Sequence, residues 1–236
     1  MVNLHQRSHE PEWMDGQDVS QAEYTACIKD LAHVNTLTLA RRPTLAFIDR
    51  ALRATPDTHD LTIVDVGYGA GDMLRALARL IARRGRQARL IGFDINPRSE
   101  PAARSLTPAT DNIDFRTGDA FAMAESEQID IVISSLVTHH MTNDEIVRFL
   151  KWMEQRASIG WFVNDLRRNW LPYHGFRLLA GILHWHPFVR HDGPLSIARA
   201  FRRDDWSKLL SAATLGDTAE VQGWFPFRYC VEHAKW

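Results

Sequence analysis

The feature that most constrains the fold is a repeated alternation of short apolar segments and helical segments between residues 61 and 164. The apolar segments lack the polar alternation of a half-exposed strand, so each would be buried on both faces. Strands of this kind alternate with helices in proteins whose parallel sheet is covered on both sides. The pattern therefore predicts an α/β fold, with strands over 61–66, 89–94, 113–117, 129–134 and 159–164.

The segment before this pattern is predicted to be helical. Apolar residues recur at helical spacing over 21–53, and Ser20 with Glu23 forms a capping box at the start. Pro43 is expected to divide this stretch into two helices, because proline lacks the backbone N–H that a helix interior needs. We therefore predict an N-terminal helical cap over residues 1–56.

The segment after the pattern is different in composition. Residues 166–203 are rich in Arg, His, Trp and Pro, and they interrupt the strand–helix alternation. A helix is then predicted over 204–213, followed by closing strands over 219–224 and 227–233. We predict one main domain over 57–236 with a lid-like insertion at about 166–203.

Composition limits the classes of partner and compartment. The net charge is −1 and no basic tract is present, so a nucleic-acid partner is not expected. The two cysteines, Cys27 and Cys230, have no metal-site spacing and favour a reducing compartment. No apolar stretch indicates a signal peptide or a membrane span, so we expect a cytoplasmic protein without stable membrane insertion.

A glycine-rich turn follows the first predicted strand. Asp65 ends that strand, and Gly67, Gly69 and Gly71 allow the backbone to turn sharply and approach a ligand closely. A dinucleotide-binding loop would need a small residue at position 72, where Asp72 stands instead. A carboxylate there would repel a pyrophosphate, which argues against a nicotinamide cofactor.

The spacing D-x-G-x-G-x-G resembles motif I of class I S-adenosylmethionine-dependent methyltransferases. The resemblance implies S-adenosylmethionine as cofactor and a Rossmann-like sheet, mostly parallel with an antiparallel last strand. The sulfonium and ammonium groups of that cofactor would be attracted by carboxylates. It also implies that Asp94 binds the ribose hydroxyls and Asp119 the adenine amino group. Further cofactor contacts are expected from Ile95, Ala120 and Ser135.

Two adjacent histidines follow the fourth predicted strand, where this fold places the transferred methyl group. A phenolic hydroxyl, with a pKa of about 10, benefits from a base during methylation. The imidazole pKa of about 6.5 makes histidine suitable for that task. We expect His139 or His140 to be the catalytic base. Alternatively, one of the pair caps the next helix or packs in the core, which fits His139 better.

Three further segments resemble a family of small bacterial methyltransferases associated with polyketide-type aromatic or quinone-like products. They are Leu136–His140, Val163–Arg168 and Arg190–Pro194. The resemblance implies a small aromatic or lipid-like acceptor and O-methylation of a phenolic or polyketide-derived hydroxyl. The expected acceptor contacts are Trp13, Met14, Asp165, Tyr173 and His191. A homodimer is compatible with the aromatic residues of the N-terminal helices.

No metal site is predicted from these residues. Asn164 and Asp165 could offer oxygen ligands, but Ser134 and Ser135 stand where a second carboxylate would be needed. No cysteine or compact ligand set joins His184, His186 and His191.

Three other functions remain open at this point. C-methylation of a quinone precursor would need the same pocket. An NAD-dependent oxidoreductase is disfavoured by Asp72 and by the lack of a Tyr-x-x-x-Lys pair. A non-catalytic cofactor-binding module is disfavoured by the intact acids Asp65, Asp94 and Asp119, which argue for retained cofactor binding.

Overall fold

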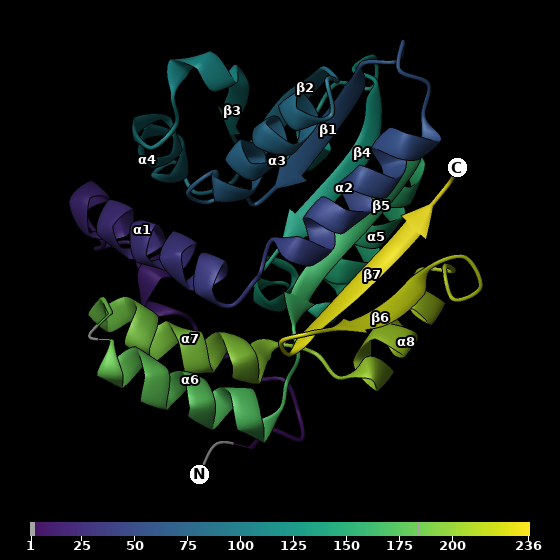
Figure 1. The fold of residues 1–236 in the computed structure, drawn as a ribbon. Helices are drawn as coiled ribbons and strands as arrows, with labels where there is room; N and C mark the ends of the chain where they lie inside the picture. Colours follow the sequence, from purple (N-terminus) through teal and green to yellow (C-terminus); the bar gives the residue numbers. More distant parts are fainter. Residues whose placement is uncertain (1–2, 184) are drawn as a thin grey trace.

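The computed structural model describes residues 3–183 and 185–236 and is built around one twisted sheet (Figure 1). The described residues form seven strands in the order β3-β2-β1-β4-β5-β7-β6. The first five strands are parallel, whereas β7 is antiparallel to both β5 and β6. The predicted mixed α/β sheet is therefore confirmed. The strands are β1 Leu61–Val66, β2 Ala88–Asp94, β3 Ile113–Thr117, β4 Ile129–Ser135, β5 Ala157–Leu166, β6 Glu220–Trp224 and β7 Arg228–Ala234.

Helices cover both faces of this sheet and form two apolar cores. On one face, α2 (Arg42–Ala54) and α3 (Asp72–Arg83) pack against Leu61 and Ile63 of β1. On the other face, α5 (Asn143–Arg156) and α8 (Arg203–Ala212) pack against a core that includes Val64 of the same strand. Burial on both faces explains why the strands read as continuous apolar runs. The short helix α4 (Ser99–Ser105) precedes β3.

Three helices lie beyond the carboxyl ends of the parallel strands (Figure 1). The helix α1 (Gln21–Leu37) starts at the predicted Ser20–Glu23 capping box. The predicted insertion forms α6 (Trp170–Ile182) and α7 (Pro187–Arg199), which lie side by side as a hairpin. His184 lies outside the described residues. Cys27 and Val34 of α1 pack against Val189 of α7, so the N-terminal helix and the insertion share an apolar contact.

The segment before α1 also lies against the insertion. We call residues 7–16 the N-terminal strap; it contains the 3-10 turn η1 (Trp13–Asp15). The Ser8 N–H donates to the Ala198 carbonyl oxygen (3.0 Å), and the carboxylate of Asp192 accepts the N–H groups of Trp13 and Met14 (2.9 and 3.0 Å). These bonds hold the strap to α7 from end to end. None of the described helices is long and apolar enough to cross a membrane.

Candidate active site

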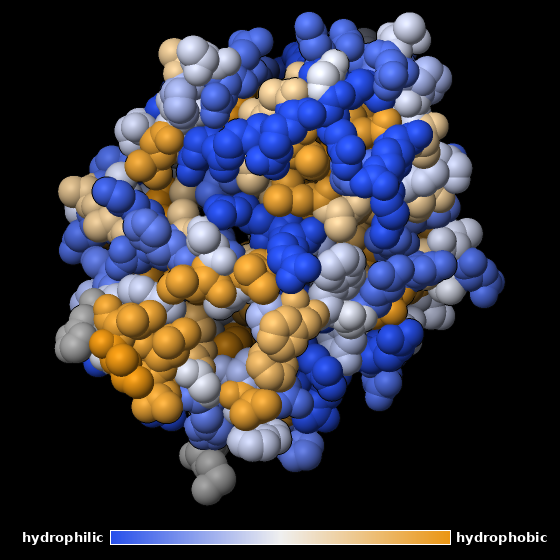
Figure 2. Space-filling model, viewed as in Figure 1, coloured by the Kyte–Doolittle hydropathy of each residue, from blue (hydrophilic) through white to orange (hydrophobic). Residues whose placement is uncertain are grey.

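A cavity of about 1160 Å³ lies between the carboxyl ends of the parallel strands and the layer formed by α1, α6 and α7. In open α/β sheets, this edge is where ligands bind. Its walls come from the glycine-rich loop, the ends of β2 and β4, and the strap. Figure 2 shows apolar surface over the region of the α6–α7 hairpin, next to a more polar surface over the rest of this view.

The glycine-rich loop between β1 and α3 is tightly packed at two of its three glycines. Gly67, Gly69 and Gly71 all have positive φ, at 79°, 51° and 70°. A Cβ atom at Gly67 would lie 2.2 Å from a methyl of Val137, and one at Gly71 would lie 2.8 Å from the ring of Phe115. At Gly69 nothing lies within 4 Å, so this part of the loop faces open space. The loop can therefore accept a ligand against its backbone at Gly69.

Asp65 is buried beneath this loop without a positive partner among the described residues, and it is 1% exposed. Burial, together with the charges of Asp72 and Asp94, raises the pKa of its carboxyl group well above the usual value. The neighbouring Asp72 forms an ion pair with Arg41 at 3.0 Å. Asp65 thus lines the cavity as a carboxyl group that a cationic ligand group would stabilise in its charged form.

Asp94 and Asp119 lie at the ends of the next two strands. The Asp94 carboxylate accepts the Gly69 and Asn96 N–H groups, both at 2.9 Å, and burial still raises its pKa. The adjacent Ile95 side chain is 79% exposed, so it presents an apolar surface to the cavity that it lines. Asp119 is exposed and caps a 3-10 turn by accepting the Phe121 N–H. Ala120 and Ser135 also line the cavity.

The two histidines lie in the 3-10 turn η4 (Thr138–His140), which follows β4. The strand β5 pairs with β4 and brings Asp165 beneath this turn. The Asp165 carboxylate contacts His139 Nδ1 at 2.8 Å and accepts hydrogen bonds from Thr138 Oγ1 and the His139 N–H. Burial opposes the charged form, but His139 and these bonds lower the pKa of Asp165 to about 2. Asp165 is therefore a buried carboxylate that orients His139.

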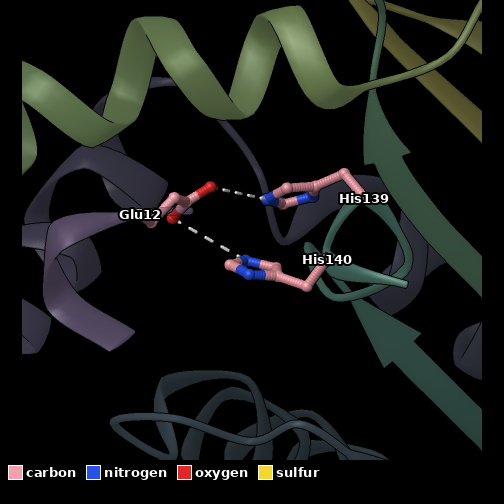
Figure 3. Close-up of side chains that lie close together, drawn as sticks. All are labelled: Glu12, His139 and His140. Atoms are coloured by element: carbon pink, nitrogen blue, oxygen red, sulfur yellow. Dashed lines mark ion pairs between the residues drawn. The ribbon is translucent and has the colours of Figure 1, made fainter. Parts of the chain in front are cut away.

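The strap adds two acids to this group. Glu12 is 4% exposed, and its carboxylate oxygens lie 3.7 Å from His139 Nε2 and 3.8 Å from His140 Nε2 (Figure 3). Asp15 lies 3.3 Å from His140 Nδ1. Burial alone would lower the pKa of His140, but its hydrogen bond with Asp15 and the charges of Glu12 and Asp15 outweigh burial and raise that pKa. Both imidazoles line the cavity with their Nε2 atoms directed toward Glu12.

The predicted acceptor contacts fall into two groups in the structure. Met14 lines the cavity, whereas Trp13, Asp165, Tyr173 and His191 do not. Trp13 and His191 stack on each other, with ring centroids 3.6 Å apart, and thereby fasten the strap to α7. Tyr173 packs with Ile197 and Ala198 between the two helices of the hairpin. Trp13, Tyr173 and His191 therefore support the wall of the cavity without lining it.

Sequence reasoning missed several residues that line the cavity. Glu12 and Asp15 are not preceded by a strand or a recognisable motif, so no local signal pointed to them. Phe176 and Leu179 of α6, which belong to the insertion that was predicted to be lid-like, also line the cavity. The remaining unforeseen contacts include Tyr24, Leu31 and Arg228.

Comparison with known proteins agrees with this architecture. Residues 63–158 match a family model described as a methyltransferase domain. That region contains most of β1, all of β2 to β4, the glycine-rich loop, all three strand-end acids and both histidines. The family match and the strand order together indicate a methyltransferase domain over this part of the chain. No curated protein matches its sequence significantly.

Solved structures of methyltransferases share the fold at low sequence identity. Human N-acetylserotonin methyltransferase, in complex with S-adenosylmethionine, is 17% identical with a TM-score of 0.61, covering 92% of this chain and 56% of that one. The plantazolicin methyltransferase BpumL is 12% identical with a TM-score of 0.62, covering 91% and 96%. The CurJ carbon methyltransferase is 14% identical with a TM-score of 0.65, covering 92% and 61%. The chain thus spans little more than half of the human enzyme, and these likenesses concern the fold.

Proposed function

We propose that this protein is an S-adenosylmethionine-dependent O-methyltransferase acting on a small hydrophobic, phenolic or polyketide-derived hydroxyl. One observation carries the proposal: a single cavity joins three strand-end acids to a pair of carboxylate-bound histidines. The family match supports methyl transfer, and it argues against the oxidoreductase alternative. The histidine pair supports a reaction in which a proton must be removed.

The cavity's cofactor end fits S-adenosylmethionine chemically. When bound, this cofactor supplies an electrophilic methyl group on a positively charged sulfur. Asp65, buried without a cation, would hold the ammonium group, while Asp94 would accept hydrogen bonds from the ribose hydroxyls. The exposed Ile95 would cover one face of the adenine, and Asp119 would bind its amino group. Solved neighbours in complex with S-adenosylmethionine or its product S-adenosylhomocysteine support this assignment.

The acceptor end is lined largely by apolar side chains. Met14, Leu31, Phe176 and Leu179 line the cavity from the strap, α1 and α6. Pockets for a single small ligand measure about 300–1,000 Å³, so a cavity of about 1160 Å³ has room for a cofactor and a second molecule. This lining would hold an aromatic or lipid-like acceptor and exclude water from its hydroxyl group. The two helices of the α6–α7 hairpin would thereby act as the lid.

The histidines are placed to remove the hydroxyl proton. Carboxylates only accept hydrogen bonds, so each Nδ1 that contacts Asp165 or Asp15 carries a proton. In the neutral imidazole, Nε2 then keeps a lone pair directed into the cavity. The hydroxyl proton would pass to Nε2 of His139 or His140. The acceptor oxygen would bond to the methyl carbon as the carbon–sulfur bond breaks, leaving its electron pair on sulfur.

C-methylation is the second candidate, and it needs a similar base beside a carbon nucleophile. The CurJ carbon methyltransferase shares the fold of this chain with a TM-score of 0.65, which is compatible with C-methylation. Product analysis separates the two candidates, because an O-methyl ether and a C-methyl group give different carbon chemical shifts.

The test combines binding with turnover. S-adenosylhomocysteine and NAD are titrated separately into the full-length protein by calorimetry, and S-adenosylmethionine is then incubated with a panel of alkylated phenols and hydroxyquinones. We expect binding of S-adenosylhomocysteine alone, and one added methyl group on a phenolic oxygen. Binding of NAD instead, or transfer to none of the acceptor classes, would contradict the proposed function.

A further inference from the structure

We propose that Glu12, His139 and His140 form a binding site for a zinc ion at the acceptor end of the cavity. One ligand atom from each residue lies within 4.8 Å of the other two. Two histidines and one glutamate, with a fourth position for water or substrate, form one of the common catalytic zinc sites. The sequence-based expectation of no metal considered Asn164 and Asp165 and the histidines His184, His186 and His191, and it did not include Glu12.

The distances between these atoms do not correspond to hydrogen bonds. The two N···O separations of 3.7 and 3.8 Å exceed the 2.7–3.2 Å of an N–H···O bond. In a tetrahedral zinc site with ligand distances of about 2.1 Å, neighbouring ligand atoms are about 3.4 Å apart. The three ligand atoms lie within 4.8 Å of one another, so side-chain movements of about 1 Å would bring them to the separations of a tetrahedral site.

The surrounding residues hold all three ligands as a metal site requires. A metal-binding histidine usually donates its other ring N–H to a carboxylate, which fixes the tautomer and directs the free nitrogen at the metal. His139 has this arrangement with Asp165 (2.8 Å), and His140 Nδ1 lies 3.3 Å from the Asp15 carboxylate. The Glu12 carboxylate in turn accepts a hydrogen bond from Ser196 Oγ (2.8 Å).

The charge balance around these atoms also favours a cation. The buried Glu12 carboxylate faces the two imidazole Nε2 atoms and has no Lys or Arg partner among the described residues. Arg7 and Arg199, the cationic side chains packed against the turn, donate instead to backbone carbonyl oxygens of residues 139–141. A divalent cation between the three ligand atoms would supply the missing positive charge.

The consequence for catalysis rests on the proposed function. A zinc ion lowers the pKa of an oxygen ligand in its open position, so the acceptor would bind as its anion at neutral pH, and its hydroxyl proton would be released to solvent as it enters the cavity. Both Nε2 atoms would then be metal ligands, and neither histidine would serve as the base. Binding of the ion itself does not depend on methyl transfer, so the two proposals can fail separately.

The first experiment measures metal content and metal binding in the full-length protein. Elemental analysis of protein purified without chelators is expected to give about one zinc per chain. After removal of the zinc, Co²⁺ is titrated in as a coloured probe, and tetrahedral coordination is expected to give strong visible absorption. Glu12→Gln and His140→Gln remove a ligand each and are expected to abolish that absorption.

Two more variants separate a metal site from general loss of structure. Asp15→Asn keeps the three ligands but weakens the support of His140, so it is expected to weaken Co²⁺ binding about 10–100-fold. His233→Asn is the matched control, because His233 of β7 pairs with Glu154 of α5, and this variant is expected to bind Co²⁺ normally. Calorimetry with S-adenosylhomocysteine shows whether each variant is folded.

The result that overturns the metal proposal is a protein that binds S-adenosylhomocysteine but neither contains zinc nor gives the Co²⁺ spectrum. A spectrum that persists in Glu12→Gln and His140→Gln would also overturn it. A protein that binds Co²⁺ at these residues but transfers no methyl group would instead contradict the proposed function and leave the metal site standing.

Discussion

The two ends of the cavity are built in different ways. At the cofactor end, Asp65 and Asp94 lie in the paired strands β1 and β2, and Asp119 follows the neighbouring strand β3 by two residues. At the acceptor end, Glu12 comes from the strap, while His139 and His140 come from the turn after β4. The first end depends on the central core, whereas the second depends on contacts between the strap, η4 and α7. Substitutions should therefore be able to impair one end while sparing the other.

The largest effect is expected at the acceptor end, on turnover. His139→Asn removes an Nε2 atom that acts either as base or as metal ligand, and loss of a general base typically costs about 10²–10⁴-fold in rate. The affinity for S-adenosylhomocysteine should stay within about twofold, because no cofactor contact is expected from His139. Steady-state kinetics and calorimetry measure the two quantities, with His233→Asn as control. A parallel loss of cofactor affinity would show that the two ends are not separable.

A somewhat smaller effect is expected at the cofactor end, on binding. Asp94→Ala removes a carboxylate that would accept two ribose hydroxyl bonds, each contributing about 1.5–3 kcal/mol. The dissociation constant for S-adenosylhomocysteine should rise about 100-fold or more. Calorimetry measures this change. Asp114→Ala is the control, because it removes a partly exposed carboxylate of β3 that does not line the cavity. Unchanged affinity would exclude Asp94 from the cofactor site.

A moderate effect is expected from loosening the strap. Asp192→Ala removes the acceptor of the Trp13 and Met14 N–H groups, so Glu12 would be held less firmly against the histidines. We expect turnover to fall about 10-fold, because small misplacements at a catalytic centre are costly. Cofactor affinity should be unchanged. Asp217→Ala, at an exposed loop position, is the control for turnover, and an Asp192→Ala enzyme with full activity would contradict a role for the strap.

The smallest effect is expected on stability, and it has the opposite sign to the effect on binding. The pKa of Asp65 is raised in the folded protein, so the folded state retains a proton that the unfolded chain releases as the pH rises above the ordinary value. Stability contributed by this group therefore falls through that pH window. Asp65→Asn should raise the Tm of the ligand-free protein at pH 7, by about 2–4 °C for each kcal/mol gained.

The same variant should bind S-adenosylhomocysteine more weakly, because its amide cannot balance the ligand's ammonium charge. Wild-type binding should weaken as the pH falls through the raised pKa of Asp65, since the ligand needs the ionised carboxylate. Thermal scanning without ligand and calorimetry at several pH values measure these outcomes. A lower Tm together with unchanged binding would show that Asp65 supports the fold alone.

The difference between the two ends also explains which parts of the fold and the site could be predicted from the sequence. Strand positions and the glycine-rich loop were predictable because each strand-end acid is adjacent in sequence to the apolar strand that places it. The bounds of β1 and β3 were predicted without error, whereas β5 is longer at both ends than expected because Ala157 pairs with β4 and Leu166 pairs with β7. Local patterns indicate which segments form strands, but partner strands determine where they end.

The acceptor end depends on contacts between segments far apart in sequence. Glu12 reaches the histidines only because the strap is fastened to α7 through Asp192 and through the Trp13–His191 stack. Side-chain direction on the hairpin was equally hard to predict, since apolar residues of α6 point both into the cavity, as Phe176 does, and to solvent, as Leu178 does at 68% exposure. No periodicity distinguishes these two directions when a helix is apolar on several sides.

One contact limits how independent the two ends can be. The backbone at Gly67 lies so close to Val137 that even a methyl group would not fit between them, and Val137 directly precedes the turn that carries both histidines. A displacement of the glycine-rich loop on cofactor binding would therefore be passed to the histidine turn by direct steric contact. Ligand binding at one end would therefore shift the other end, and the ligand that binds first would change the affinity for the second.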